Sequence, residues 1–338
     1  MSERVAILGG GSWGTALALI LGQAGKEVTL WARDETLVAE FHRSHLNRQY
    51  LPEIPLPASV RMTHDLKESV EGAEAILWAV PSGAFRAVAQ SVAPYISQDA
   101  LLISTTKGLE EGSGLRMSEL LALAFSCAEP RIVALSGPNL ALEVARGVPT
   151  ATVAASQSKE AAQGAQSLFL GATQPTFRVY TSRDVIGVEL GGAIKNVIAI
   201  GAGICEGLGF GDNAKAALVT RGLAEIVRLG VCLGAEPETF LGLSGVGDLF
   251  ATTSSRLSRN YRVGLGLGQG EPLPAILERL GQVAEGVPTT QVVSQLASKH
   301  RVEMPLCHAL ASVLFESRTA TEVIRELMLR PPKEELAT

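Results

Sequence analysis

The stretch Val5-Ala6-Ile7-Leu8-Gly9-Gly10-Gly11-Ser12-Trp13-Gly14 lies at the start of the chain and decides its fold. It places a G-x-G-x-x-G turn between an apolar run typical of a buried strand and a second run, residues 15–20, typical of a packed helix. In this setting Gly9 permits a tight turn, Gly11 lets a pyrophosphate approach the backbone, and Gly14 lets the helix pack on the strand. The first N–H groups of such a helix also attract phosphate. The stretch therefore predicts a dinucleotide-binding turn.

Four more apolar runs follow, at residues 28–31, 73–80, 100–104 and 131–136. They are continuously apolar and separated by helical segments, which is typical of a parallel sheet covered on both faces. From about residue 182 onward, helical periodicity and glycine- or proline-containing turns replace this pattern. We therefore predict an α/β chain, with an N-terminal Rossmann-type domain of mostly parallel sheet over residues 1–182 and an all-α domain over 183–338. A chain of 338 residues is long enough for two such cores.

Bulk composition excludes several functions. A formal charge of −5 gives no electrostatic basis for binding nucleic acid. The first residues lack the pattern of a signal peptide, so we expect no export. The most apolar stretch, residues 191–205, is interrupted by Lys195 and Asn196 and falls short of the ~20 residues that span a bilayer. The four cysteines are far apart and no histidine spacing suggests a metal site. We expect a cytoplasmic enzyme without a metal and not inserted in a membrane, and the apolar second domain leaves a homodimer open.

Ligands of parallel sheets bind beyond the carboxyl ends of the strands. The polar residues at these ends are therefore candidate site residues: Ser12, Trp13, Arg33, Ser82, Lys107 and Asn139. After residues 28–31, Ala32 occupies the position where an acidic residue would bind the ribose of NAD, and Arg33 follows. This favours NADP(H), while Asp34 leaves NAD(H) open.

A lysine and an asparagine stand in the most apolar helix of the second domain. Gly191 and Gly192 lie four and three residues before Lys195, so on a helix they share its face. We expect them to leave a bare surface where substrate and cofactor approach the ammonium group. The alternative is that the glycines serve helix packing and that Lys195 extends to solvent.

Asp248 lies in a second apolar, glycine-lined segment, residues 242–252, where an isolated charge would be costly. Lys195 is its expected partner, and Thr252, four residues on, shares its helix face. Ser258-Arg259-Asn260 follows, and its hydroxyl, guanidinium and amide suit a phosphate monoester.

The chain resembles the bacterial-type NAD(P)-dependent glycerol-3-phosphate dehydrogenases from Val5 to about Thr290. The motifs that carry the resemblance are GGGSWGTA (9–16), TKGLE (106–110), SGPN (136–139), GVELGGAIKN (187–196), GDNAKAA (211–217), TRG (220–222), GVGDL (245–249) and SRN (258–260). The resemblance implies reversible reduction of dihydroxyacetone phosphate to sn-glycerol 3-phosphate with NAD(P)H, for glycerophospholipid synthesis.

The resemblance also implies roles for individual residues. Lys195 would exchange a proton with the substrate oxygen, and Lys107 and Asp248 would complete the catalytic group, the two ammonium groups flanking Asp248 depressing the pKa of one lysine. Substrate binding is implied for Lys107, Gly137, Asn139, Lys195, Asn196, Asp248, Thr252, Ser258, Arg259 and Asn260. Cofactor binding is implied for Gly9, Gly11, Ser12, Trp13, Gly14, Arg33, Lys107, Ala141, Arg259, Val283 and Glu285. Many relatives have serine at the position of Asn139, so its contact is open.

Two other functions fit parts of this pattern. Reductases of β-hydroxyacids or of ketopantoate also join a nucleotide fold to a helical domain with a lysine, but their substrates carry carboxylates rather than phosphate. A catalytically inactive NADP(H) sensor would need the glycine turn but neither lysine nor Asp248.

Overall fold

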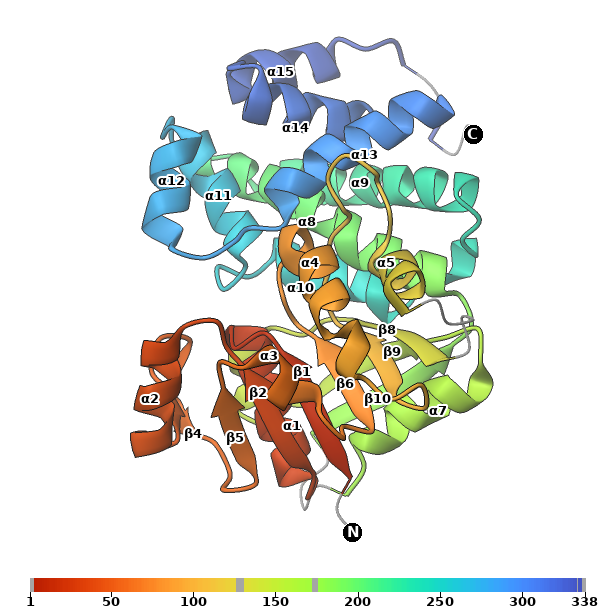
Figure 1. The fold of residues 1–338 in the computed structure, drawn as a ribbon. Helices are drawn as coiled ribbons and strands as arrows, with labels where there is room; N and C mark the ends of the chain where they lie inside the picture. The colour runs from red at the N-terminus through yellow and green to blue at the C-terminus, as the bar shows by residue number, and fades with distance from the viewer. Residues whose placement is uncertain (1–2, 126–130, 172–175, 333, 336–338) are drawn as a thin grey trace.

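A computed structural model describes residues 3–125, 131–171, 176–332 and 334–335 of the chain. It contains a sheet-based N-terminal part and a helical C-terminal part, which lies over the carboxyl edge of the sheet (Figure 1). The last strand of the sheet ends at Ser182 and the first helix after it begins at Val185, on either side of the predicted boundary.

Eight strands of the described residues form one sheet, and it is mostly parallel, as predicted. Their order is β10-β9-β8-β7-β6-β1-β2-β5, and all neighbours are parallel except β8 and β9. The chain runs outward from β1 in both directions, so β1 and β6 flank the crevice in which such sheets bind ligands. The bounds are β1 Arg4–Leu8, β2 Glu27–Trp31, β5 Val60–Thr63, β6 Ala75–Trp78, β7 Leu101–Ser104, β8 Ile132–Ser136, β9 Thr150–Ala155 and β10 Phe177–Ser182.

The central strands are apolar throughout because both of their faces are buried. In β1, Val5 and Ile7 belong to one buried cluster, whereas Ala6 and Leu8 belong to another on the opposite face. The helices that cover the sheet are α1 Ser12–Gln23, α2 Glu35–Ser44, α3 Leu66–Val70, α4 Ser82–Val92, α5 Met117–Phe125, α6 Ala141–Ala145 and α7 Lys159–Leu168.

Five strands were not predicted from the sequence: β5, β9, β10, and the β3 (Leu46–Asn47) and β4 (Leu51–Pro55) of a small hairpin. Buried residues alternate with exposed ones along part of β5 and β10 and with partly buried ones along part of β9, so these strands lack the apolar run that marked the central ones. An alternating pattern of this kind is typical of strands that have only one buried face.

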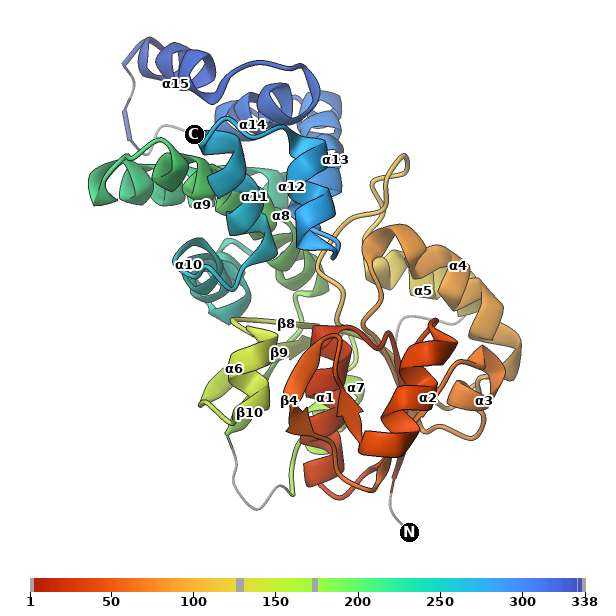
Figure 2. The ribbon, with the colours of Figure 1, turned by 90° about the vertical axis from the view of Figure 1, so that its left-hand side faces the viewer.

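The helical part is built around α8 (Val185–Gly207), and Asp184 caps its N-terminus by accepting a hydrogen bond from the N–H of Gly187. The helices that follow are α9 Asp212–Cys232, α10 Asp248–Thr253, α11 Arg259–Gly268, α12 Leu273–Leu280, α13 Gly286–His300, α14 Pro305–Phe315 and α15 Ala320–Met328. Short turns η3 (Pro237–Leu241) and η4 (Leu243–Gly247) precede α10. Figure 2 shows α9, α11 and α13 gathered about α8.

Helix α8 also corrects an expectation about length. Its 23 residues are long and apolar enough to cross a membrane, so the apolar stretch is not too short for this, as had been expected. However, 94% of its most apolar 18-residue window is buried inside the protein. Burial, not length, identifies it as the core helix of the second part.

Candidate active site

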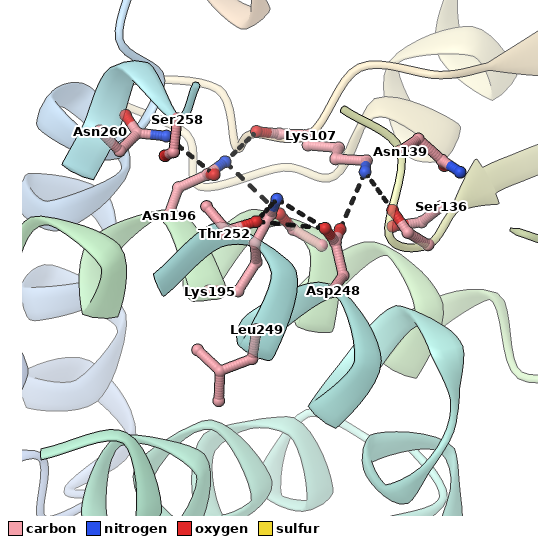
Figure 3. Close-up of polar contacts among 12 residues, drawn as sticks. Lys107, Ser136, Asn139, Lys195, Asn196, Asp248, Leu249, Thr252, Ser258 and Asn260 are labelled. Atoms are coloured by element: carbon pink, nitrogen blue, oxygen red, sulfur yellow. Dashed lines mark hydrogen bonds and ion pairs between the residues drawn. The ribbon is translucent and has the colours of Figure 1, made fainter. Parts of the chain in front are cut away.

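Two lysines share one aspartate where the two parts of the chain meet (Figure 3). Lys107, in the loop after β7, donates from Nζ to Oδ2 of Asp248 at 2.8 Å. Lys195, in the middle of α8, donates to Oδ1 of the same carboxylate at 2.8 Å and to the hydroxyl of Thr252 at 2.5 Å. Asp248 and Thr252 lie one turn apart on α10, as their spacing predicted. Lys107 also donates to the carbonyl of Gly137 at 2.6 Å.

This cluster is buried, which changes the acidity of Lys195. Lys195 is 6% exposed and Asp248 only 1%. The pKa of Lys195 is lowered to about 8, mainly by burial; Asp248 opposes this shift, and the charges of Lys107 and Arg259 add to it. The predicted direction for one lysine is therefore confirmed, but desolvation contributes more than the neighbouring ammonium group. A lysine with this pKa can hold and release a proton near neutral pH.

The glycines beside Lys195 serve packing, which corrects the expected bare surface. A Cβ on Gly191 would lie 2.6 Å from the carbonyl oxygen of Ser244, and one on Gly192 would collide with the hydroxyl of Ser136. Both glycines are buried. They bring α8 against η4 and the end of β8, and Lys195 points into the cluster rather than to solvent.

A chain of amide hydrogen bonds connects the cluster to α11 and α13. Asn196 donates to the carbonyl of Lys107 at 3.1 Å, and Asn260 donates to Oδ1 of Asn196 at 2.8 Å. The N–H of Gly286 in turn donates to Oδ1 of Asn260 at 2.8 Å. These bonds fix the Lys107 loop, which belongs to the first part, relative to the helix that carries Lys195.

The first turn of α11 presents groups suited to an anion. Ser258 is its N-cap and accepts a hydrogen bond from the N–H of Tyr261 at 3.2 Å, which leaves its own proton available. Arg259 follows, half-buried, and its guanidinium makes no hydrogen bond or ion pair with the residues that the structure describes. Burial lowers the pKa of Arg259, while the charge of Glu285 raises it. The N-terminus of a helix and an unpaired guanidinium both favour a phosphate group.

Gly137 and Asn139 differ in what they face. Gly137 has φ +157° and presents its carbonyl to Lys107. The side chain of Asn139 lies 3.4 Å from the carbonyl of Ala151 and accepts a hydrogen bond from Thr152 at 3.1 Å. Its amide is thus engaged with β9 and directed away from the lysines, as Figure 3 shows.

The glycine turn has the shape that a dinucleotide requires. Gly9 adopts φ +125°, and a Cβ there would lie 2.6 Å from the carbonyl oxygen of Ala79. A Cβ on Gly14 would collide with the carbonyl of Gly9, whereas one on Gly11 would meet nothing within 4 Å. The turn is therefore closed where the helix packs on the strand and open at Gly11. The first N–H groups of α1 have no acceptor within the helix, so they can bind phosphate.

The other predicted cofactor residues of the first part lie around this turn. Ser12 begins α1, and its hydroxyl lies 3.5 Å from the carbonyl of Tyr50. Trp13 and Ala141 pack on the same buried cluster, and the indole N–H of Trp13 has no acceptor in the described structure. Arg33 is exposed after β2, and Asp34 caps α2 by accepting from the N–H groups of Thr36 and Leu37 at 2.8 and 3.3 Å.

Glu285 crosses to the first part of the chain. It accepts hydrogen bonds from the N–H of Ser82 at 2.9 Å and from its hydroxyl at 2.5 Å, at the start of α4. Burial raises the pKa of Glu285, and the bonds from Ser82 lower it. Val283, two residues earlier, is 46% exposed.

A second buried carboxylate, which was not predicted from the sequence, joins the two parts of the chain. Glu189, six residues before Lys195 on α8, accepts from Arg116 Nη1 and from the N–H of Ser118, each at 2.8 Å. It is 8% exposed. The signal that revealed Asp248, a carboxylate in an apolar segment, is present here too. Among the described residues no group of three or more histidine, cysteine, aspartate or glutamate side chains could hold a metal ion.

Comparison with known proteins gives one consistent result. The family models of the N-terminus and C-terminus of NAD-dependent glycerol-3-phosphate dehydrogenase match residues 4–162 and 184–325. The chain is 47% identical to glycerol-3-phosphate dehydrogenase (NAD(P)+) of Pelotomaculum thermopropionicum, over 99% of its own length and 96% of that protein. Its fold matches the crystal structure of glycerol-3-phosphate dehydrogenase from Coxiella burnetii with a TM-score of 0.92 and 41% identity, over 97% of this chain and 99% of that one. A ketopantoate reductase from Ralstonia eutropha shares only the fold, with a TM-score of 0.59 and 16% identity over 95% of this chain and all of that one.

Proposed function

The chain belongs to the NAD-dependent glycerol-3-phosphate dehydrogenase family, and we propose that the cluster of Lys195, Lys107 and Asp248 carries out the family's reaction. The protein is an NAD(P)H-dependent glycerol-3-phosphate dehydrogenase. It reversibly reduces dihydroxyacetone phosphate to sn-glycerol 3-phosphate, from which glycerophospholipids are built. The observation that supports the site most strongly is the burial of this cluster, because it gives Lys195 a pKa of about 8.

In our proposal Lys195 gives a proton to the carbonyl oxygen during reduction and takes it back during oxidation. The nicotinamide, when bound, supplies the hydride that adds to the carbonyl carbon. Lys107 polarises the carbonyl and helps to stabilise the developing alkoxide. Asp248 holds both ammonium groups in place, and Thr252 fixes the position of Lys195 Nζ.

The substrate phosphate would bind at the first turn of α11. Ser258, Arg259 and Asn260 supply a hydroxyl proton, an unpaired guanidinium and an amide N–H there, and Asn196 holds Asn260 in position. Gly137 and Asn139 would line the opposite side. Binding of a phosphate remote from the reacting carbon orients the carbonyl between the lysines.

For the cofactor we propose binding at Gly9, Gly11, Ser12, Trp13, Gly14, Arg33, Lys107 and Ala141, with Arg259, Val283 and Glu285 closing over it. We propose NADP(H) as the favoured cofactor, with NAD(H) also accepted. Arg33 is exposed and available for a ribose 2′-phosphate, whereas the Asp34 carboxylate is occupied as a helix cap and so is poorly placed to bind ribose hydroxyls.

We further propose that the enzyme works in the cytoplasm on this small phosphorylated substrate, without nucleic acid or membrane insertion, and that it forms a homodimer through its helical part. Exposed apolar side chains on that part, among them Val231 and Phe250, support an interface. Sedimentation of the purified protein would show the mass of two chains, and sedimentation as a single chain would reject the dimer.

The experiment that tests the function is the rate of NADPH oxidation, and separately of NADH oxidation, with dihydroxyacetone phosphate. Unphosphorylated dihydroxyacetone is the control substrate. We expect strong turnover only with the phosphorylated ketone, and faster turnover with NADPH at limiting cofactor. Equal rates with both ketones would contradict the phosphate site at α11, and a preference for NADH would contradict the role of Arg33.

A further inference from the structure

The β3–β4 hairpin lies against the glycine-rich turn and contributes one buried side chain to it. Asn47, at the end of β3, is 0% exposed. Its Nδ2 donates to the carbonyl of Gly10 at 2.8 Å and to the hydroxyl of Thr15 at 2.8 Å.

Every side-chain proton of Asn47 and Thr15 that can be donated is used in these hydrogen bonds. The two protons of Asn47 Nδ2 go to Gly10 and Thr15, so the Thr15 hydroxyl acts as an acceptor toward Asn47. Thr15 then donates its single proton to the carbonyl of Gly11 at 2.8 Å. The carbonyl of Gly10 is thus held directly by Asn47, and that of Gly11 is held by the Thr15 hydroxyl together with the Thr15 N–H at 2.9 Å.

Fixing a carbonyl also fixes the N–H group on the other side of the same peptide. The peptide is planar and trans, so the N–H of the next residue points opposite to the carbonyl. Holding the Gly10 carbonyl therefore orients the N–H of Gly11, and holding the Gly11 carbonyl orients the N–H of Ser12. Both donors are directed away from Asn47 and Thr15, at the point where the turn is open.

We propose that Asn47 is a positioning residue for the cofactor, which orients the Gly11 and Ser12 N–H groups toward the pyrophosphate. It touches neither cofactor nor substrate and acts through the backbone of the turn. The inference rests on the proposed function, which places the pyrophosphate at this turn. Donors held in advance bind a ligand more tightly because no ordering is needed on binding.

The test compares ligands with and without a pyrophosphate. Asn47→Leu keeps a similar volume but removes both donated bonds. We expect the Kd of NADPH, from fluorescence titration, to rise about tenfold or more, as expected when hydrogen bonds to a charged group are weakened. The Kd of adenosine 2′-monophosphate, which lacks the pyrophosphate, should stay within about twofold, and kcat at saturating NADPH should be unchanged. Gln49→Ala, at an exposed position of the same hairpin, is the matched control.

Two outcomes would overturn the inference. An unchanged Kd for NADPH would show that Asn47 does not position the turn. Equal weakening of both ligands, with a lowered Tm, would show a general structural role. If Asn47→Leu does not fold, Thr15→Val tests the same bonds, with Thr15→Ser expected to restore NADPH binding. A wild-type protein that reduces dihydroxyacetone phosphate while these variants bind NADPH normally would reject this inference alone and leave the proposed function intact.

Discussion

Replacing Asp248 with asparagine removes the negative charge beside Lys195 but keeps nearly the same side-chain shape, so we expect it to change the pKa of Lys195. Asp248 is the neighbour that raises the pKa of Lys195, whereas burial, Lys107 and Arg259 all lower it. The carboxylate lies 2.8 Å from Lys195 Nζ. Two unit charges about 4 Å apart interact with about 4 kcal/mol at an effective dielectric constant of 20.

Loss of about 4 kcal/mol would weaken the proton affinity of Lys195 about a thousandfold, since about 1.4 kcal/mol corresponds to a factor of ten. With a starting pKa of about 8, Lys195 is mostly protonated at pH 7 in the wild type. In the variant only about one molecule in a hundred would keep the proton at that pH. We therefore expect kcat for reduction at pH 7 to fall about 100-fold, and to recover partly as the pH is lowered.

The assay is the pH dependence of kcat for reduction at saturating NADPH and dihydroxyacetone phosphate, for the wild type and Asp248→Asn. Thr252→Val is the control, because it removes a partner of Lys195 without removing a charge. Circular dichroism and NADPH titration at each pH verify folding, since removing one partner of a buried ion pair destabilises a protein by about 3–5 kcal/mol. A folded Asp248→Asn variant whose pH profile coincides with that of the wild type would refute the reasoning.

Three further changes have defined outcomes. In the wild type, reduction needs protonated Lys195, so its kcat should decrease as the pH rises through about 8 while kcat for oxidation increases; parallel profiles in the two directions would contradict this. Arg33→Gln should raise the KM for NADPH about 10- to 100-fold, the effect of losing a charged hydrogen bond, and leave the KM for NADH unchanged in initial-rate measurements. Glu189→Gln should lower the free energy of unfolding in urea by about 3 kcal/mol, because it breaks a buried pair with Arg116. The more exposed partner of Arg116, Glu119, provides the control, since its replacement should cost below about 1 kcal/mol.

Much of this site was predictable from the sequence because several of its residues are unusual in their local segments. Asp248 and Lys195 are charged residues in apolar segments, and each needed a partner. The glycine turn has a spacing that only a few structures require. These signals pair Lys195 with Asp248, whereas the place of Lys107 beside them was implied only by the family resemblance; the structure adds the distances and the dominant role of burial in the pKa of Lys195.

Other features could not be predicted because they depend on contacts between distant segments. The Ser82 bonds of Glu285 join residues 203 positions apart, and nothing near either residue indicates the other. Asn47 lies in a polar stretch that resembles a loop, and only the folded chain brings its amide to Gly10. Gly191 and Gly192 could be assigned to the face of Lys195, but the neighbours that require glycine there, Ser244 and Ser136, come from other elements.

The most direct test of the central role of Lys195 is a single-turnover experiment with Lys195→Met, in which excess enzyme is mixed with NADPH and dihydroxyacetone phosphate. Lys299→Met, at an exposed position, is the control. We expect NADPH to bind Lys195→Met with nearly wild-type affinity and its oxidation to become at least about a thousandfold slower, because the proton donor to the alkoxide is missing. Oxidation of NADPH at the wild-type rate by the folded variant would contradict the assignment of Lys195 as the group that exchanges the proton.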